Sequence, residues 1–253
     1  MTLRAALYLS LICLLAGCVR TGGQVDPLET EKGRDAARDA YIQLGLGHLQ
    51  QGATEQAKEP LKKALELDPK SVDAHVMLGL VFQQELEVEL ADQHFREAIS
   101  LNPSEARLHN NYGSFLFEQQ RYGEALEQFK LASKDPLYPE RSRVFENLGL
   151  TALQMKNDEQ AKKYFERALR MNSNRPTALL QMAQLSFSEG QYVPARKYYS
   201  QYSKISGQNP QSLLLGIRLA KVFQDRDQAA SLGLQLKRLY PGTPEYQQYV
   251  SEQ

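Results

Sequence analysis

The feature that most constrains the fold of this 253-residue chain is a repeat with a period of 34 residues. The first copy contains Tyr41, Leu44, Gly45, Ala57, Leu61, Ala64 and Pro69. The second copy has the same positions displaced by 34, namely His75, Leu78, Gly79, Ala91, Phe95, Ala98 and Pro103. Apolar residues three and four apart predict two amphipathic helices per copy, and the glycine lets them cross closely. Because one such pair cannot bury its own apolar face, the copies must stack on one another.

Four further copies follow, and the pattern weakens toward the end of the chain. The third contains His109, Tyr112, Gly113, Ala125, Phe129 and Ala132, and the fourth contains Phe145, Leu148, Gly149, Ala161, Phe165 and Ala168. The fourth is displaced by 36 residues, and the two extra residues fall in the connection Asp-Pro-Leu-Tyr-Pro at 135–139. The fifth contains Leu179, Met182, Ala183, Ala195, Tyr199 and Tyr202, and the sixth contains Leu213, Ala220, Ala229, Leu236 and Pro241. Weak final copies are typical of a capping region.

This period and these residues resemble the tetratricopeptide repeat (TPR) family. The resemblance implies an all-α fold, a right-handed superhelix of six TPR helix-turn-helix repeats. We expect the repeats to span residues 35–243, approximately as 38–71, 72–105, 106–141, 142–175, 176–209 and 210–243. A signal peptide (1–17), a lipidated tether (18–34) and a C-terminal tail (244–253) complete the expected organisation.

The amino terminus carries a processing signal. Arg4 precedes an apolar run from Ala5 to Leu15, which is too short to span a bilayer but has the length of a signal-peptide core. The following Leu-Ala-Gly-Cys, ending at Cys18, resembles the bacterial lipobox, which implies cleavage before Cys18 and its acylation. Two or three acyl chains anchor a protein stably. The alternative is a secretory signal with an incidental cysteine. Val19, in place of the aspartate that retains lipoproteins in the inner membrane, favours the periplasmic face of the outer membrane.

In the TPR family the first helix of each repeat lines a concave surface. By that resemblance the first repeat offers Asp39, Ile42, Leu46, Leu49 and Gln50, and the second offers Asp73, Val76, Leu80, Gln83 and Gln84. Five of these side chains form an apolar strip where the fold does not need one, and polar residues flank it. An exposed apolar strip with a polar rim predicts a protein-binding groove. The alternative is that residues 28–34 fold back and cover it.

The third and fourth repeats present a polar face instead. Its residues are Arg107, Asn110, Asn111, Ser114, Arg143, Glu146 and Asn147. The asparagines could bond a peptide backbone and the arginines a carboxylate, as in chaperone-binding members of the family. The lysines of that carboxylate clamp are absent from the first repeat, so we favour a solvated polar face.

Several function classes are disfavoured. Lys plus Arg equals Asp plus Glu, 30 each, so no net basic field would attract nucleic acid. The two cysteines, Cys13 and Cys18, both precede the repeats, which excludes a cysteine-rich zinc site there. No nucleotide-binding or catalytic motif occurs, and we expect no enzyme, metal or cofactor. His75 and His109 occupy equivalent positions, and we interpret them as packed core histidines rather than a metal pair.

Lipobox position, chain length, six repeats and the 135–139 insertion together resemble the type IV pilus biogenesis and stability lipoproteins, or pilotins. That resemblance implies a monomeric outer-membrane lipoprotein that binds secretin subunits and promotes their localisation and multimerisation. The alternative is a general periplasmic scaffold for peptidoglycan-remodelling or other envelope-assembly proteins. An enzyme with a regulatory repeat arm is a third, poorer hypothesis, because the repeats leave no room for a catalytic domain.

Overall fold

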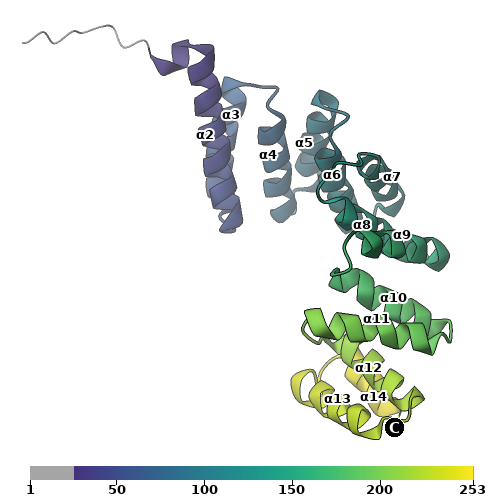
Figure 1. The fold of residues 1–253 in the computed structure, drawn as a ribbon. Helices are drawn as coiled ribbons and strands as arrows, with labels where there is room; N and C mark the ends of the chain where they lie inside the picture. The colour runs from purple at the N-terminus through teal and green to yellow at the C-terminus, as the bar shows by residue number, and fades with distance from the viewer. Residues whose placement is uncertain (1–25, 253) are drawn as a thin grey trace, which may run out of the picture. The chain divides into compact units, whose positions relative to one another are not determined.

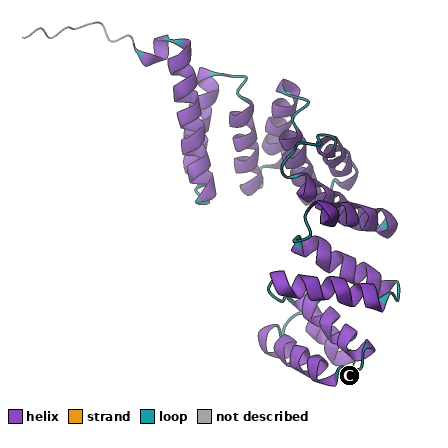
Figure 2. Ribbon diagram, viewed as in Figure 1, coloured by secondary structure: helices purple, strands orange, loops and turns teal. Residues whose placement is uncertain are grey.

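The computed structural model describes residues 26–252, and all regular elements in that range are helices (Figure 1, Figure 2). A short 3-10 helix, η1 (Pro27–Glu29), precedes the α-helices. These are α2 (Glu31–Gln50), α3 (Thr54–Leu67), α4 (Val72–Gln84), α5 (Val88–Leu101), α6 (Ala106–Glu118), α7 (Tyr122–Ser133), α8 (Arg141–Gln154), α9 (Asp158–Met171), α10 (Pro176–Ser188), α11 (Tyr192–Ile205), α12 (Pro210–Val222), α13 (Arg226–Leu239) and α14 (Pro244–Ser251). The predicted all-α fold is confirmed. The predicted signal peptide and Cys18 lie outside the described residues.

The helices from α2 to α13 form six consecutive helix-turn-helix pairs. We call the first helix of each pair the leading helix and the other the second helix. The second helices begin at Thr54, Val88, Tyr122, Asp158, Tyr192 and Arg226, so successive starts lie 34, 34, 36, 34 and 34 residues apart. The two additional residues fall between the end of α7 and the start of α8, as the sequence predicts. The six-repeat interpretation is therefore confirmed, including the weak fifth and sixth copies.

Both ends of the array extend beyond the predicted repeats. α2 begins at Glu31 because the hydroxyl of Thr30 caps it, accepting the N–H of Gly33 at 3.0 Å. The end of the predicted tether is thus part of α2. At the other end, the predicted tail folds as α14, which starts with the favourable cap Thr243 followed by Pro244.

Within most repeats, the two helices cross at a glycine. A Cβ atom on Gly45 would lie 2.6 Å from Cγ and Cδ2 of Leu61, and one on Gly149 would lie 2.5 Å from Cε1 of Phe165. Both partner side chains are fully buried. A larger residue at the crossing would have to displace them, which explains the glycine in the repeated pattern.

The sixth repeat reverses this small-to-large arrangement. Ile217 stands where the first four repeats have the crossing glycine, and Gly233 stands where they have Leu or Phe. A Cβ on Gly233 would collide with the hydroxyl of Tyr249, so a ring from α14 fills the vacant space. Ile217 packs in one apolar cluster with Leu236, against which Tyr249 also lies.

The chain divides into two compact units, with the boundary inside α4 after Met77. In the first unit, Ile42, Ala64 and Ala74 form the core, with Leu65 and Met77 packed against it. In the second unit, the largest core runs from α5 to α10 and is built on buried aromatic rings and alanines, including Phe95, Phe115, Phe129, Phe145 and Phe165.

The turn between the two helices of every repeat uses one residue in the left-handed conformation. These residues are Gly52, Leu86, Gln120, Lys156, Gly190 and Gln224, with φ between 59° and 74°. In the first repeat, Gly52 N–H donates to the carbonyl of Leu49, and the next N–H donates to that of His48. This pattern closes the helix end regardless of side chain.

The two equivalent histidines are packed as the sequence predicts. Both are buried, and each directs Nε2 to the carbonyl of a proline six residues earlier. That distance is 3.1 Å from His75 to Pro69 and 2.8 Å from His109 to Pro103. Because a carbonyl only accepts, Nε2 carries the proton in both rings. Each histidine thus fastens a leading helix to the connection that precedes it.

Candidate functional site

The predicted binding residues occupy three positions that recur in every leading helix, and we name each position by its first-repeat residue. The Ile42 position holds Ile42, Val76, Asn110, Glu146, Leu180 and Leu214. The Leu46 position holds Leu46, Leu80, Ser114, Leu150, Gln184 and Arg218. The Leu49 position holds Leu49, Gln83, Phe117, Leu153, Phe187 and Lys221. We call these residues together the leading-helix face.

The Ile42 position is buried in all six repeats, which corrects the prediction of an exposed strip. Ile42 is 8% exposed and Val76 is 0% exposed. The physical reason is that this position faces the neighbouring leading helix rather than open space. Ile42 lies in one cluster with Ala74 of α4, and Glu146 of α8 reaches the start of α10. Neither Ile42 nor Val76 is therefore available to a partner in this conformation.

Leu49 is also buried, at 8% exposed, so its predicted exposure is wrong as well. Leu46 differs, because the Leu46 position is half-buried in every repeat. Asp39 and Gln50 are exposed on the same helix, and Asp39 pairs with Arg38 at 2.8 Å. In the first unit, Leu46 is therefore the one apolar residue of the predicted strip that is still partly accessible. The predicted rim residue Asp73 is exposed on α4.

In the second unit, the predicted residues Leu80 and Gln83 are both half-buried. The side-chain amide of Gln83 donates to Oε2 of Glu118 at 2.6 Å, which ties α4 to α6. Gln83 therefore has a structural contact of its own, whereas Leu80 presents a partly open apolar side chain.

The same face carries apolar residues that sequence reasoning missed. A hollow of about 200 Å³ lies between α6 and α8, lined by Phe117, Glu118, Asn147 and Leu150 among others. A second, of about 300 Å³, lies between α10, α12 and α14, with Phe187 on its wall. The spacing used for the first two repeats identifies Phe117, Leu150 and Phe187 when it is extended to the later ones.

The predicted polar face is not arranged as a carboxylate clamp. Arg107 is engaged by Glu105 at 2.7 Å, and Arg143 by Glu140 at 3.5 Å. Asn110 is buried, at 3% exposed, and accepts a hydrogen bond from the Asn147 amide at 3.4 Å. Its predicted role in bonding a client backbone thus conflicts with its burial. Asn111 is half-buried.

Glu146 was expected on that polar face but serves the contact between repeats. One carboxylate oxygen accepts from Arg175 at 2.6 Å, and the other accepts the backbone N–H of Ala178 at 3.0 Å. The carboxylate thereby satisfies a backbone N–H in the first turn of α10. No group of three His, Cys, Asp or Glu side chains within residues 26–252 is placed to hold a metal ion. None of the helices in this range combines the length and apolar character needed to cross a membrane.

Comparison with known proteins agrees with the repeat architecture. TPR family models match residues 45–85, 72–105, 104–174 and 146–210. The type IV pilus assembly protein PilF of Pseudomonas aeruginosa is 61% identical over 252 residues, which is 100% of both chains. The chain belongs to the PilF family. The prediction of a TPR protein of type IV pilus biogenesis is thus confirmed at the level of the family, which is a non-enzymatic scaffold family.

Solved structures support the same relationship. A structure of Pseudomonas aeruginosa PilF has a TM-score of 0.85 and 63% identity, covering 88% of this chain and all of that one. PilW, described as a widely conserved type IV pilus biogenesis factor, has a TM-score of 0.73 and 27% identity, covering 84% of this chain and 98% of that one. The fold of this chain is therefore similar to that of solved type IV pilus biogenesis proteins.

Proposed function

We propose that this PilF-family protein is a lipoprotein, acylated at Cys18 and held on the periplasmic face of the outer membrane, that binds secretin subunits. It acts in type IV pilus biogenesis by bringing these subunits to the membrane and promoting their multimerisation. The relationship to PilF over the whole chain supports the pilus role. The lipobox ending at Cys18 supports the anchor.

The observation that carries the binding role is the half-buried apolar side chain at the Leu46 position. Leu46 and Leu80 are leucines that the core does not fully enclose. Fully burying an exposed leucine contributes roughly 1.5–3 kcal/mol, so completing the burial of a half-buried one contributes about half of that. Asp39, which pairs with Arg38, and Gln50 are exposed on the same helix and form a polar rim.

Leu46→Lys tests this role. We expect a folded protein whose secretin binding is at least about tenfold weaker. The lost apolar burial and the cost of desolvating the lysine ammonium together reach roughly 1.4 kcal/mol, which corresponds to that factor. Heat-resistant secretin multimers should disappear from cells carrying the variant. Circular dichroism and the thermal midpoint report folding.

Leu44→Lys is the matched control. Leu44 lies two residues away on α2, is 51% exposed, and projects about 200° around the helix from Leu46. It should leave the multimers intact, whereas Leu65→Lys should destabilise the fold, because half-buried Leu65 packs against the core of the first unit. Assembled rings with a folded Leu46→Lys protein would refute the assignment. Shape defects with intact rings in a deletion strain would favour the general envelope scaffold.

The anchor is tested separately by Cys18→Ser. We expect a folded, unacylated protein that leaves the outer-membrane fraction, because one or more acyl chains then no longer hold it there. Unchanged partition into outer membranes on fractionation would contradict the proposal.

A further inference from the structure

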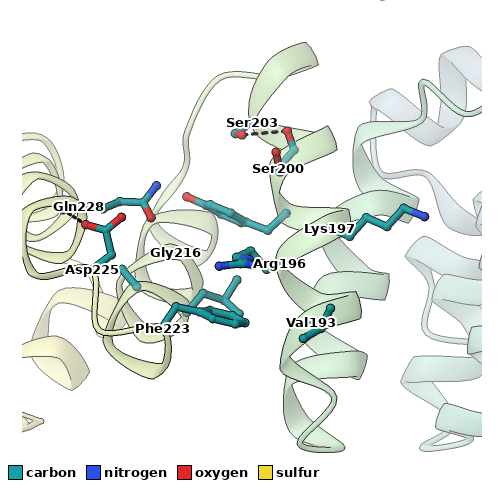
Figure 3. Close-up of a pocket in the computed structure, with 12 residues that line it drawn as sticks. Val193, Arg196, Lys197, Ser200, Ser203, Gly216, Phe223, Asp225 and Gln228 are labelled. Carbon is teal, nitrogen blue, oxygen red and sulfur yellow. Dashed lines mark hydrogen bonds between the residues drawn. The ribbon is translucent and has the colours of Figure 1, made fainter.

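A second candidate contact surface lies on the other side of the last repeats. A hollow of about 540 Å³ opens between α11, α12 and α13 (Figure 3). Its α12 wall is formed by Gly216, Leu219, Ala220 and Phe223. At 100° per residue, Gly216 and Ala220 project away from Leu214 and Arg218, which belong to the leading-helix face. The hollow is therefore distinct from that face.

One wall of the hollow has a glycine where most other repeats have a large side chain. At the place of Gly216, the leading helices of the second to fifth repeats have Leu78, Tyr112, Leu148 and Met182, all buried. Tyr112 shows what this position does, because its ring packs on Phe95 of the preceding second helix at 6.0 Å. A Cβ atom at Gly216 would collide with the hydroxyl and Cζ of Tyr199 and with Cδ1 of Leu232, so these two side chains fill the space next to the glycine. The remaining volume is left open to solvent.

The helix that forms one wall of the hollow is basic. Helix α11 carries Arg196, Lys197 and Lys204 and no acidic residue. The guanidinium of Arg196 lies 3.7 Å above the centre of the Phe223 ring, whereas Lys197 extends away from it (Figure 3). No ion pair to Arg196 or Lys197 occurs within the described part of the chain. Asp225 is the one acid in the lining, and its Oδ1 accepts the N–H of Gln228 at 2.9 Å as the cap of α13.

The hollow offers one cationic group and one apolar wall, and a single ligand can contact both. Stacking on Phe223 fixes the plane of Arg196, which leaves its N–H edge able to bind a carboxylate. Tyr199, Leu219 and Phe223 provide an apolar wall beside it. The volume lies within the roughly 300–1,000 Å³ usual for ligand sites, and it is large enough for one aromatic side chain.

We propose that the hollow between α11, α12 and α13 binds an acidic polypeptide segment through an aromatic side chain seated against Phe223 and a carboxylate on Arg196. The charge of α11 favours an acidic partner over a basic one. This site differs in location from the proposed secretin contact at Leu46. A client or a second envelope protein could therefore occupy the two faces at once.

The test uses the full mature protein and a fluorescein-labelled peptide with the sequence Gly-Ser-Asp-Asp-Phe-Asp-Asp-Ser-Gly, followed by fluorescence anisotropy. We expect Arg196→Glu to weaken binding at least about tenfold, or 1.4 kcal/mol. Lys204→Glu makes the same charge change on the same helix away from the hollow and should weaken binding much less. Replacing the peptide's Phe by Ala should also cost at least about tenfold.

A second variant fills the space without removing a charge. Ser200 is exposed on the rim, so Ser200→Trp should keep the thermal midpoint but block the peptide. Leu46→Lys should leave peptide binding unchanged, which separates this proposal from the secretin assignment. Equal losses with Arg196→Glu and Lys204→Glu, or equal binding of the Ala peptide, would overturn it. So would Arg196-dependent binding of phosphatidylglycerol vesicles or oligothymidylate in place of the peptide.

Discussion

The glycine at the helix crossing gives a sharp test of how the repeats are held together, because α2 contains two glycines with opposite surroundings. Gly45 lies against fully buried Leu61, and a Cβ there would come within 2.6 Å of two of its carbon atoms. Gly47, two residues later, has no atom within 4 Å of an added Cβ. Gly45→Ala and Gly47→Ala therefore make the same chemical change in one helix.

The expected magnitudes follow from two effects. Alanine is favoured over glycine in a helix interior by roughly 0.5–1 kcal/mol, so Gly47→Ala should raise the free energy of unfolding by about that amount. Gly45→Ala gains the same helical preference but forces Leu61 to move, and overpacking of a core costs roughly 1–3 kcal/mol. The net result at Gly45 is a loss of up to about 2 kcal/mol, and the difference between the variants measures the overpacking alone.

The assay is urea unfolding followed by circular dichroism, with thermal midpoints as a second measure. One kcal/mol corresponds to roughly 2–4 °C in a chain of this size class. Gly45→Ala should unfold at a lower midpoint than the parent, and Gly47→Ala at a higher one. If Gly45→Ala is as stable as Gly47→Ala, the Leu61 side chain can move aside at little cost. Close approach of α2 and α3 is then not the reason for the glycine at position 45.

Three further variants test other contacts. Glu146→Ala should cost about 3 kcal/mol, because it leaves Arg175 and an N–H at the start of α10 without their acceptor; a loss below about 1 kcal/mol in urea unfolding would refute this. Leu86→Gly should raise the thermal midpoint, corresponding to about 0.5–1 kcal/mol, since Leu86 is 80% exposed at φ 60°, and a lower midpoint would contradict the argument. Burial, and then its hydrogen bond to Asp92, raises the pKa of Tyr112 from 10.0 to about 12. As pH rises, the tyrosine of the unfolded chain therefore loses its proton first. The contribution of Tyr112 to the free energy of unfolding is fully present below pH 10 and is lost between pH 10 and 12, so Tyr112→Phe should reduce the fall in stability over that range.

The repeat pattern predicted the helices well because it records close packing inside each pair. The spacing from Gly45 to Leu61 recurs as Gly149 to Phe165, and each spacing marks a real crossing. Even the weak sixth copy was placed correctly, although Ile217 and Gly233 exchange the small and large residues. The pattern could not predict which side chain fills the space beside Gly233, because the ring of Tyr249 comes from α14, a helix outside the six repeats.

The predicted binding strip was only partly right, for a reason that lies between repeats. A family pattern assigns Ile42 to the concave surface, but burial depends on how closely the next leading helix approaches. The structure brings Ala74 against Ile42, and no spacing within one repeat contains that information. Leu44 shows the reverse case. It belongs to the buried pattern but is exposed, because this position packs on a preceding second helix, as Tyr112 does on α5, and none precedes α2 in the described residues.

Helix α14 also affects the local unfolding of the sixth repeat. It begins at Pro244, 34 residues after Pro210 of α12, and thus has the place of a leading helix after the sixth repeat. In a linear array, where stability is a sum of neighbouring contacts, fraying starts at the ends. The short helix takes that terminal place, so α13 has a neighbour on both sides. Amide hydrogens of α13 should therefore exchange with deuterium as slowly as those of an interior helix, while those of α14 exchange faster than those of α13.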